Sequence, residues 1–275
     1  MGVHRRVRTA FTTVVAVAIV AVLLFPLYWM VNASFQPPAG LLETPPRWLP
    51  LDGTLEGYRE ALDGQGRALL NSVVIAAGTV ALTLLLAVPA AYALSRFRVR
   101  GAGVVLFALL LVQMVPGIVM ANSLYAVMNQ TGLLNTHLAL VLADSTVAVP
   151  FAVLILRAFM VTIPKELGEA AMVDGAGAAR VLWSVILPVS RNAMITAALF
   201  AFLFAWADFL FAISLNTDDA VMPVTVGIYR FIGAHTADWN SVMATGVIAS
   251  IPAAVLLVAA QRYVAAGVTG GALKD

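Results

Sequence analysis

Charge and cysteine are scarce in this chain. Of its 275 residues only 11% are Asp, Glu, Lys or Arg, whereas 61% are hydrophobic, and the mean hydropathy is +0.94. Ordinary soluble domains carry about a quarter charged residues, so the composition argues against a water-soluble enzyme. Because cysteine is absent, the chain has no disulfide framework, no thiolate nucleophile and no Cys-ligated metal site.

The usual signatures of catalysis and of ATP hydrolysis are also missing. The two lysines, Lys165 and Lys274, do not follow a glycine-rich phosphate-binding loop, so the chain has no P-loop. The three histidines are far apart, and neither a His-Glu-x-x-His nor a Gly-x-Ser-x-Gly motif is present. We therefore expect that this chain is not an enzyme and holds neither a cofactor nor a metal ion. The net charge of +2 reflects arginines at membrane edges, and we expect no nucleic-acid partner.

Long uncharged runs indicate helices that cross a lipid bilayer. The runs hold 34, 28, 43 and 23 residues, starting at Thr9, Ala68, Gly101 and Trp239. Each exceeds the ~20 residues that a helix needs to cross the hydrocarbon core. The polar stretch 129–137 divides the longest run into two spans. The sequence thus predicts an all-α polytopic membrane protein with six spans, over residues 11–34, 69–94, 104–128, 138–159, 193–215 and 241–260.

The first span follows a basic N-terminus and therefore resembles a signal peptide. Its apolar run is too long for one, however, and Phe-Pro-Leu-Tyr-Trp at 25–29 stands where a small-residue cleavage site would lie. We expect this segment to remain in the protein as an uncleaved span.

The distribution of basic residues predicts the orientation in the membrane. With the N-terminus inside, twelve of the 16 lysines and arginines are cytoplasmic, which agrees with the positive-inside rule. Both termini are then cytoplasmic. Within a single transmembrane domain over 1–275, we expect a small extracytoplasmic segment at 35–67, a cytoplasmic loop at 161–187 and a cytoplasmic C-terminal tail at 265–275.

The longest cytoplasmic stretch predicts a short helix. Pro164 suits its first turn and Asp174-Gly175 its end, after about ten residues, and a second helix follows. Glu166 and Glu169 lie near the positive end of the helix dipole, and two alanines between 169 and 172 provide a face without bulk. Such a helix suits a groove on another protein, and it suits equally an interfacial position on lipid headgroups.

This stretch resembles the "EAA" motif of the inner-membrane permease subunits of bacterial ABC importers. The residues that match are Glu169, Ala170, Ala171, Gly175, Leu187 and Pro188. Segments 90–97, 113–117, 132–136 and 267–274 extend the resemblance to the maltose-type carbohydrate importers over nearly the whole chain. The sequence departs from their pattern at Val185 (usually Ile), at Gly57 (commonly Asn before Tyr58) and at Ala207 (commonly Asn).

The resemblance implies a function and a set of partners. It implies the type I ABC importer permease fold in a bacterial inner membrane, with this chain forming half of the pathway for a sugar or oligosaccharide. The implied partners are a second homologous permease, two copies of an ATPase subunit that bind ATP and Mg, and an extracytoplasmic solute-binding protein. The residues implied to couple the chain to the ATPase are Glu169, Ala170, Ala171, Asp174, Gly175, Leu187 and Pro188.

Polar residues inside the predicted spans are candidates for the translocation path. Burying a charge in lipid is costly, so Asp144 and Asp208, the acids within these spans, are expected to face a cavity or a partner. The candidates for the path are Asp144, Asp208, Asn122, Gln113, Ser145 and Trp206. Such groups also serve as hydrogen-bonding contacts between helices, and the sequence leaves this alternative open.

Other functions compete with the importer. An ion-gradient-driven secondary carrier would need internal repeats and interrupted helices with several intramembrane charges, which two isolated acids support poorly. A non-transporting scaffold would not need the EAA-like loop. A relative of the same ABC family with a non-sugar solute, such as a glycerophosphodiester, also fits the sequence, which does not define the individual solute.

Overall fold

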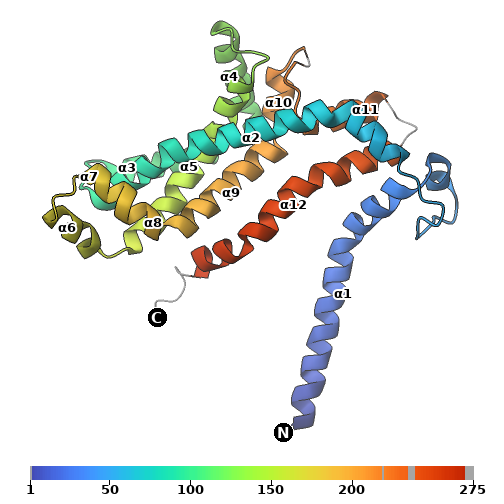
Figure 1. Cartoon of the computed structure of the whole chain (residues 1–275), viewed down its shortest axis with the longest axis horizontal. Helices are drawn as coiled ribbons and strands as arrows, with labels where there is room; N and C mark the ends of the chain where they lie inside the picture. Colours follow the sequence, from blue (N-terminus) through green and yellow to red (C-terminus); the bar gives the residue numbers. More distant parts are fainter. Residues whose placement is uncertain (1, 219, 235–238, 270–275) are drawn as a thin grey trace. The chain divides into compact units, whose positions relative to one another are not determined.

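The computed structural model describes residues 2–218, 220–234 and 239–269, and every regular element in these ranges is a helix (Figure 1). The chain divides into two compact units. One comprises Met1–Gly66 and Ile228–Ser250, and the other comprises Arg67–Gly227 and Ile251–Asp275. Two long helices, α2 (Glu56–Arg96) and α12 (Trp239–Thr269), contribute to both units.

The first unit contains α1 (Gly2–Phe35) and the loop that follows it. Beyond α1 a short 3-10 helix, η1 (Pro38–Leu42), leads into turns that end where α2 begins at Glu56. The last twelve residues of the predicted segment 35–67 are therefore helical, from Glu56 to Arg67. The apolar side chains of α1 between residues 10 and 28 are exposed within this chain, as expected of a helix whose environment is lipid.

Arg47 organises the loop between α1 and α2. Its Nε and Nη2 donate to the two carboxylate oxygens of Glu43 at 2.6 and 2.6 Å, and its Nη1 donates to Asp52 at 3.0 Å. The hydrogen bond and charge of Glu43, with a smaller contribution from Asp52, raise the pKa of Arg47. The Arg47 carbonyl oxygen accepts from Asn32 Nδ2 at 3.0 Å and Gln36 Nε2 at 2.8 Å, which ties the loop to the end of α1.

The second unit is built around the long α5 and its partner α9, which pack along each other. The helices between α2 and α12 in this part of the chain are α3 (Ala102–Val112), α4 (Gly117–Gln130), α5 (His137–Thr162), α6 (Lys165–Val173), α7 (Ala178–Val181), the π-helical η2 (Leu182–Ile186), α8 (Leu187–Val189), α9 (Arg191–Ala207) and α10 (Leu210–Leu215). A further helix, α11 (Val224–Ala234), precedes α12. Figure 1 shows α6, α7 and α8 gathered at one end of α5 and α9, and α4 and α10 at the other.

Two apolar clusters form the core of the second unit, one at each end. The cluster near α6 joins Tyr92 on α2 and Leu156 on α5 to Ile186 on η2. The cluster near α4 joins Ala121 on α4 and Ala143 on α5 to Phe211 on α10. Alanines are numerous in both clusters, and small side chains let helix backbones approach closely where no hydrophobic effect drives helices together.

Four of the predicted spans are long apolar helices in the structure. They are Thr9–Phe35, Glu56–Arg96, His137–Thr162 and Trp239–Tyr263. Two bent pairs bring the total of candidate spans to at most six. The polar stretch 129–137 separates α4 from α5 as predicted.

The prediction of one continuous helix over 104–128 was wrong. The chain bends by 99° between α3 and α4, and Gln113 to Pro116 form the break. Proline has no N–H to donate and restricts the residue before it to extended conformations, so Pro116 ends the helical run and caps the next one.

The prediction of a continuous helix over 193–215 was also wrong. Helix α9 ends at Ala207, Asp208 is extended (φ −64°, ψ 130°), and α10 starts at Leu210. At its other end α9 follows the short helices α7 to α8 after a bend of 83°. Asp208 thus lies at a helix break, where its carboxylate meets free backbone N–H groups.

Candidate functional site

The predicted cytoplasmic helix is present as α6. Pro164 precedes it in an extended conformation (ψ 138°), and Glu166 lies in its first turn. At the other end Gly175 has φ +85°, its N–H donates to Met172 O at 3.0 Å, and the N–H of Ala176 donates to Ala171 O at 2.9 Å. These bonds form a Schellman motif, which satisfies the last carbonyl groups and needs a left-handed residue at the position of Gly175.

The structure separates the EAA-type residues into exposed and buried groups. Glu169 and Ala170, and the turn residues Asp174 and Gly175, are exposed. Ala171 is half-buried and packs against the core. Leu187 is buried in that core, and Pro188 beside it is exposed. The exposed residues combine two carboxylates with two small residues, whereas Leu187 belongs to the apolar cluster against which Ala171 packs. Their predicted role toward an ATPase stays a prediction.

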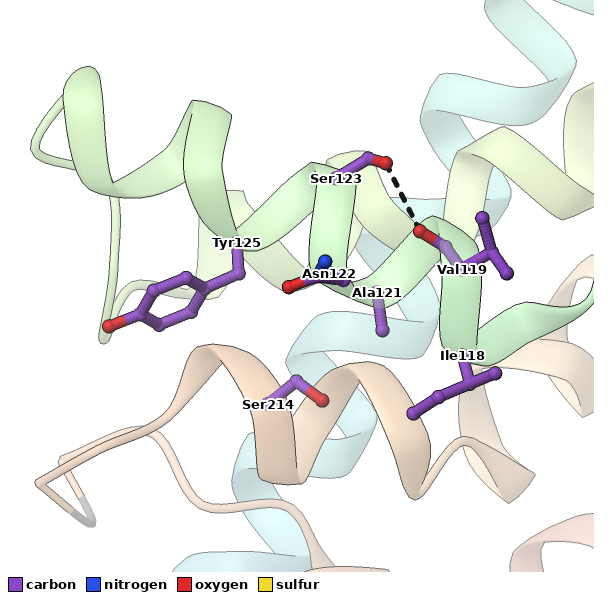
Figure 2. A pocket seen from close by; sticks show the side chains of 7 residues that line it. All are labelled: Ile118, Val119, Ala121, Asn122, Ser123, Tyr125 and Ser214. Atoms are coloured by element: carbon purple, nitrogen blue, oxygen red, sulfur yellow. Dashed lines mark hydrogen bonds between the residues drawn. The ribbon is translucent and has the colours of Figure 1, made fainter.

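A pocket of about 510 Å³ lies at the opposite end of the unit, between α4 and α10. Asn122 and Tyr125 project from α4 at its border, and Ser214 faces them from α10 (Figure 2). The hydroxyl of Ser214 donates to Leu210 O at 2.6 Å and that of Ser123 to Val119 O at 3.1 Å. Each hydroxyl keeps acceptor capacity, so the pocket offers both amide and hydroxyl groups to a polar solute.

The predicted path residues on α5 lie beside this pocket's helices. Asp144 and Ser145 are buried in the middle of α5, next to Ala143, which packs with Ala121 of α4. The Ser145 hydroxyl donates to Val141 O of its own helix at 2.6 Å. Asn122 lines the pocket, whereas Asp144 and Ser145 are buried on α5 and are not among the residues that line it.

Asp208 caps helix α10. Its carboxylate accepts the backbone N–H groups of Phe211 and Ala212 at 3.1 and 2.8 Å, and its carbonyl accepts the Thr225 hydroxyl at 2.5 Å. It also lies close enough to Asp144 for the two charges to interact. Asp208 thus has a structural role as a hydrogen-bonding group, which is the alternative to a path residue that the sequence left open. Its place in a translocation path stays a prediction.

The other two candidates do not join this cluster of residues. Gln113 is at the end of α3, in the break before Pro116. Trp206 is buried on α9 and stacks on Phe202, with ring centroids 5.3 Å apart and an interplanar angle of 15°. The sequence did not identify Ser214 as a pocket residue. The local sequence around a serine in an apolar helix does not show which distant helix that serine will face, and α4 precedes Ser214 by about 90 residues.

Comparison with known proteins places this arrangement in a family. The model of the family of binding-protein-dependent transport system inner membrane components matches residues 63–270, a range that contains both α6 and the pocket. This chain belongs to that family.

Several permeases of the family are similar to the chain over almost their whole length. The sulfoquinovosyl glycerol transport system permease protein SmoH of Agrobacterium fabrum is 34% identical, over 91% of this chain and 89% of that protein. The trehalose/maltose transport system permease protein MalG of Thermococcus litoralis is also 34% identical, over 94% of each chain. The diacetylchitobiose uptake system permease protein DasC of Streptomyces coelicolor is 30% identical, over 95% of each.

Solved permease structures share the fold. A chain of a bacterial ABC transporter that imports the acidic polysaccharide alginate superposes with a TM-score of 0.83, covering 96% of this chain and 98% of that chain at 22% identity. A chain of the alginate transporter in complex with its periplasmic protein gives a TM-score of 0.69 at 14% identity. The all-helical permease fold expected from the sequence is therefore confirmed. Residues 270–275 of the predicted tail lie outside the described part of the chain.

Proposed function

We propose that this chain is a transmembrane permease subunit of an ATP-driven importer for a carbohydrate. The family match over 63–270 carries the proposal, and the fold of the EAA-type segment as an exposed, capped helix supports it. The similar permeases are named for different sugars and sugar derivatives, which supports a carbohydrate as the class of solute and leaves the individual sugar to the solute-binding protein.

The proposal includes partners that supply what this chain lacks. Because the sequence contains no P-loop, ATP and Mg would bind to two ATPase subunits, and α6 would dock on one of them. A second permease would complete the pathway and a solute-binding protein would deliver the sugar from outside. Both termini would lie in the cytoplasm of a bacterial cell.

Charge reversal on α6 tests the coupling. In the assembled transporter Glu169→Arg should abolish sugar uptake and the stimulation of ATP hydrolysis by loaded binding protein, because an exposed carboxylate at the docking surface becomes a cation. Glu166→Arg, one turn earlier on the same helix, is the matched control. Uptake and stimulated hydrolysis that survive Glu169→Arg would contradict the docking role.

Uptake by this chain alone, in vesicles with only an ion gradient, would instead establish the secondary carrier.

The pocket between α4 and α10 is proposed to line the pathway, with Asp144 and Asp208 beside it. Asn122→Ala should raise the KM of uptake about fivefold, the value of one hydrogen bond of about 1 kcal/mol. Asn129→Ala on the same helix, outside the pocket lining, is the control. Asp208→Asn removes the charge and keeps one of the two oxygens that accept the backbone N–H groups of α10, so it disturbs the cap less than Asp208→Ala would. If Asp144→Ala and Asp208→Asn both left uptake unchanged at all sugar concentrations, the two carboxylates would have no place in the pathway.

A further inference from the structure

A second, smaller pocket of about 170 Å³ lies between the end of α2 and α6. It is lined by Tyr92 and Arg96 of α2, by Phe97 directly after that helix, and by Lys165 and Glu169 of α6, among others. It adjoins the apolar cluster that contains Tyr92 and Ile186, so its floor belongs to the core of the second unit. The pocket therefore places a basic side chain of a spanning helix opposite the glutamate of the EAA-type motif.

Arg96 lines this pocket and has a shielded guanidinium edge. Its Nε and Nη2 are buried and have no hydrogen-bond partner among the residues that the structure describes. These two nitrogens form the edge that binds a carboxylate through two parallel hydrogen bonds. Arg47 of this chain uses the same two nitrogens to hold Glu43 at 2.6 and 2.6 Å. A buried guanidinium edge without an acceptor is costly, so the geometry of Arg96 favours an oxyanion.

The surroundings of Arg96 hold its backbone in place. Tyr92 is buried and its ring meets that of Phe97 edge-on, with centroids 5.6 Å apart. The carbonyl of Leu94 accepts from Arg157 Nε at 3.3 Å, and that of Tyr92 accepts from the Ser95 hydroxyl at 2.9 Å. The last turn of α2 is thus fixed by its own contacts, and the Arg96 side chain is the group left to find a partner.

Glu169 is the carboxylate among the described residues that line the pocket. It is exposed on α6 and lines the same pocket as Arg96, so packing does not hold its side chain away from α2. Lys165 is four residues earlier on the same helix, and a Lys that precedes a Glu at this spacing stabilises less well than the reverse order. Arg96, with its preorganised fork, is the better partner.

We propose that Arg96 is the intrachain partner of Glu169, holding the coupling glutamate against α2 whenever α6 is not engaged by the ATPase. This inference rests on the proposed function, because it gives Glu169 two alternative partners, Arg96 and the ATPase. Arg96 is then a positioning residue: it lowers the population of free Glu169, and with it ATP hydrolysis in the absence of sugar. The arginine at the end of α2 thereby restrains uncoupled turnover.

The absence of cysteine allows a direct test of the contact. In the assembled complex, the thiols introduced by Arg96→Cys and Glu169→Cys should be joined readily by a short bifunctional thiol-reactive cross-linker, whose length replaces the two long side chains, without nucleotide. The reaction should be severalfold slower when the ATPase is trapped closed with ATP and vanadate. The pair Arg98→Cys and Glu169→Cys is the control, because Arg98 is exposed and does not line the pocket. Equal rates in the two states, or no faster reaction than in the control pair, would overturn the proposal.

Hydrolysis measurements test the charge. Arg96→Gln should raise sugar-independent ATP hydrolysis severalfold, Arg96→Lys should raise it less, and Arg98→Gln should leave it unchanged. In a Glu169→Gln background, Arg96→Gln should not change sugar-independent ATP hydrolysis further. Arg96 acts through Glu169, so the effects of the two substitutions should not add. An additive effect overturns the proposal.

Two outcomes distinguish the proposed function from this inference. If the chain fails to assemble with any ATPase, the proposed function itself fails. If it assembles and Arg96→Gln behaves like Arg98→Gln, only this inference fails.

Discussion

Gly57 is a residue whose identity depends on a neighbour distant in the sequence. It lies in the first turn of α2, and a Cβ atom built there would be 2.1 Å from Asn240 Oδ1 and 3.0 Å from the Asn240 backbone carbon. Asn240 is buried and cannot withdraw freely, because its Nδ2 donates to Ser34 O at 2.8 Å. The departure from the Asn that is common at this position therefore has a steric cause: the side chain of Asn240 occupies the space.

Substitution at this glycine should destabilise the protein. Gly57→Ala places a methyl group in the space that Asn240 occupies, and this overpacking should lower the free energy of unfolding by about 1–3 kcal/mol. Gly66 lies in the same helix with nothing within 4 Å of a built Cβ, so Gly66→Ala should instead stabilise by about 0.5–1 kcal/mol. Thermal unfolding of the purified protein in nanodiscs measures both changes. An equal shift in the two variants would contradict the contact with Asn240.

At the scale of the element, α6 and the turn after it are specified locally. The turn contains two glycines, and a Cβ at either would meet nothing within 4 Å. Only the conformation distinguishes them, since Gly175 has φ +85° whereas Gly177 has φ −72°. The left-handed conformation costs a residue with a Cβ roughly 1–2 kcal/mol, so Gly175 is required by the Schellman motif and Gly177 is not.

We expect the turn to respond accordingly. Gly175→Ala should lower coupled ATP hydrolysis and uptake, because strain at the end of α6 displaces the exposed residues before it. Gly175→Asn should be milder, since Asn tolerates the left-handed region, and Gly177→Ala should be nearly neutral. Uptake and stimulated hydrolysis in proteoliposomes provide the ranking. Equal losses for Gly175→Ala and Gly177→Ala would indicate that the conformation of Gly175 is unimportant.

At the scale of the whole molecule the charge distribution predicts the orientation in the membrane, and this prediction is testable because cysteine is absent from the sequence. Leu51 in the loop after α1 is 85% exposed, and Val173 at the end of α6 is 87% exposed. In intact cells a membrane-impermeant maleimide should label Leu51→Cys, whereas Val173→Cys should react only after permeabilisation. The cysteine-free protein gives the background. Labelling in the opposite order would reverse the predicted orientation and remove α6 from the side of the ATPase.

Local patterns predicted the elements well where the signal is itself local. Pro164 and Gly175 bound α6 as expected, because a missing N–H and a left-handed turn act within one helical turn. The interruption at Asp208 was not predicted, since the apolar character continues from 193 to 215 and hides the break. The end of α9 at Ala207 depends on the carboxylate of Asp208 capping α10 and on Thr225 binding the Asp208 carbonyl.

The scarcity of charge, gathered into long uncharged runs, determined by sequence alone a helical membrane protein, and the missing P-loop predicts that any use of ATP depends on a partner chain. The absence of cysteine excluded disulfides, a thiolate nucleophile and Cys-ligated metal sites. Hydropathy acts over one helix at a time, which is why it located the four long spanning helices, and Pro164 with Gly175 located the EAA-type helix by their local backbone preferences. The tertiary structure decided which helices bend, that Asn122 faces Ser214, and that Arg96 shares a pocket with Glu169. These contacts join residues tens of positions apart, and packing between helices, which no local pattern encodes, brings them together.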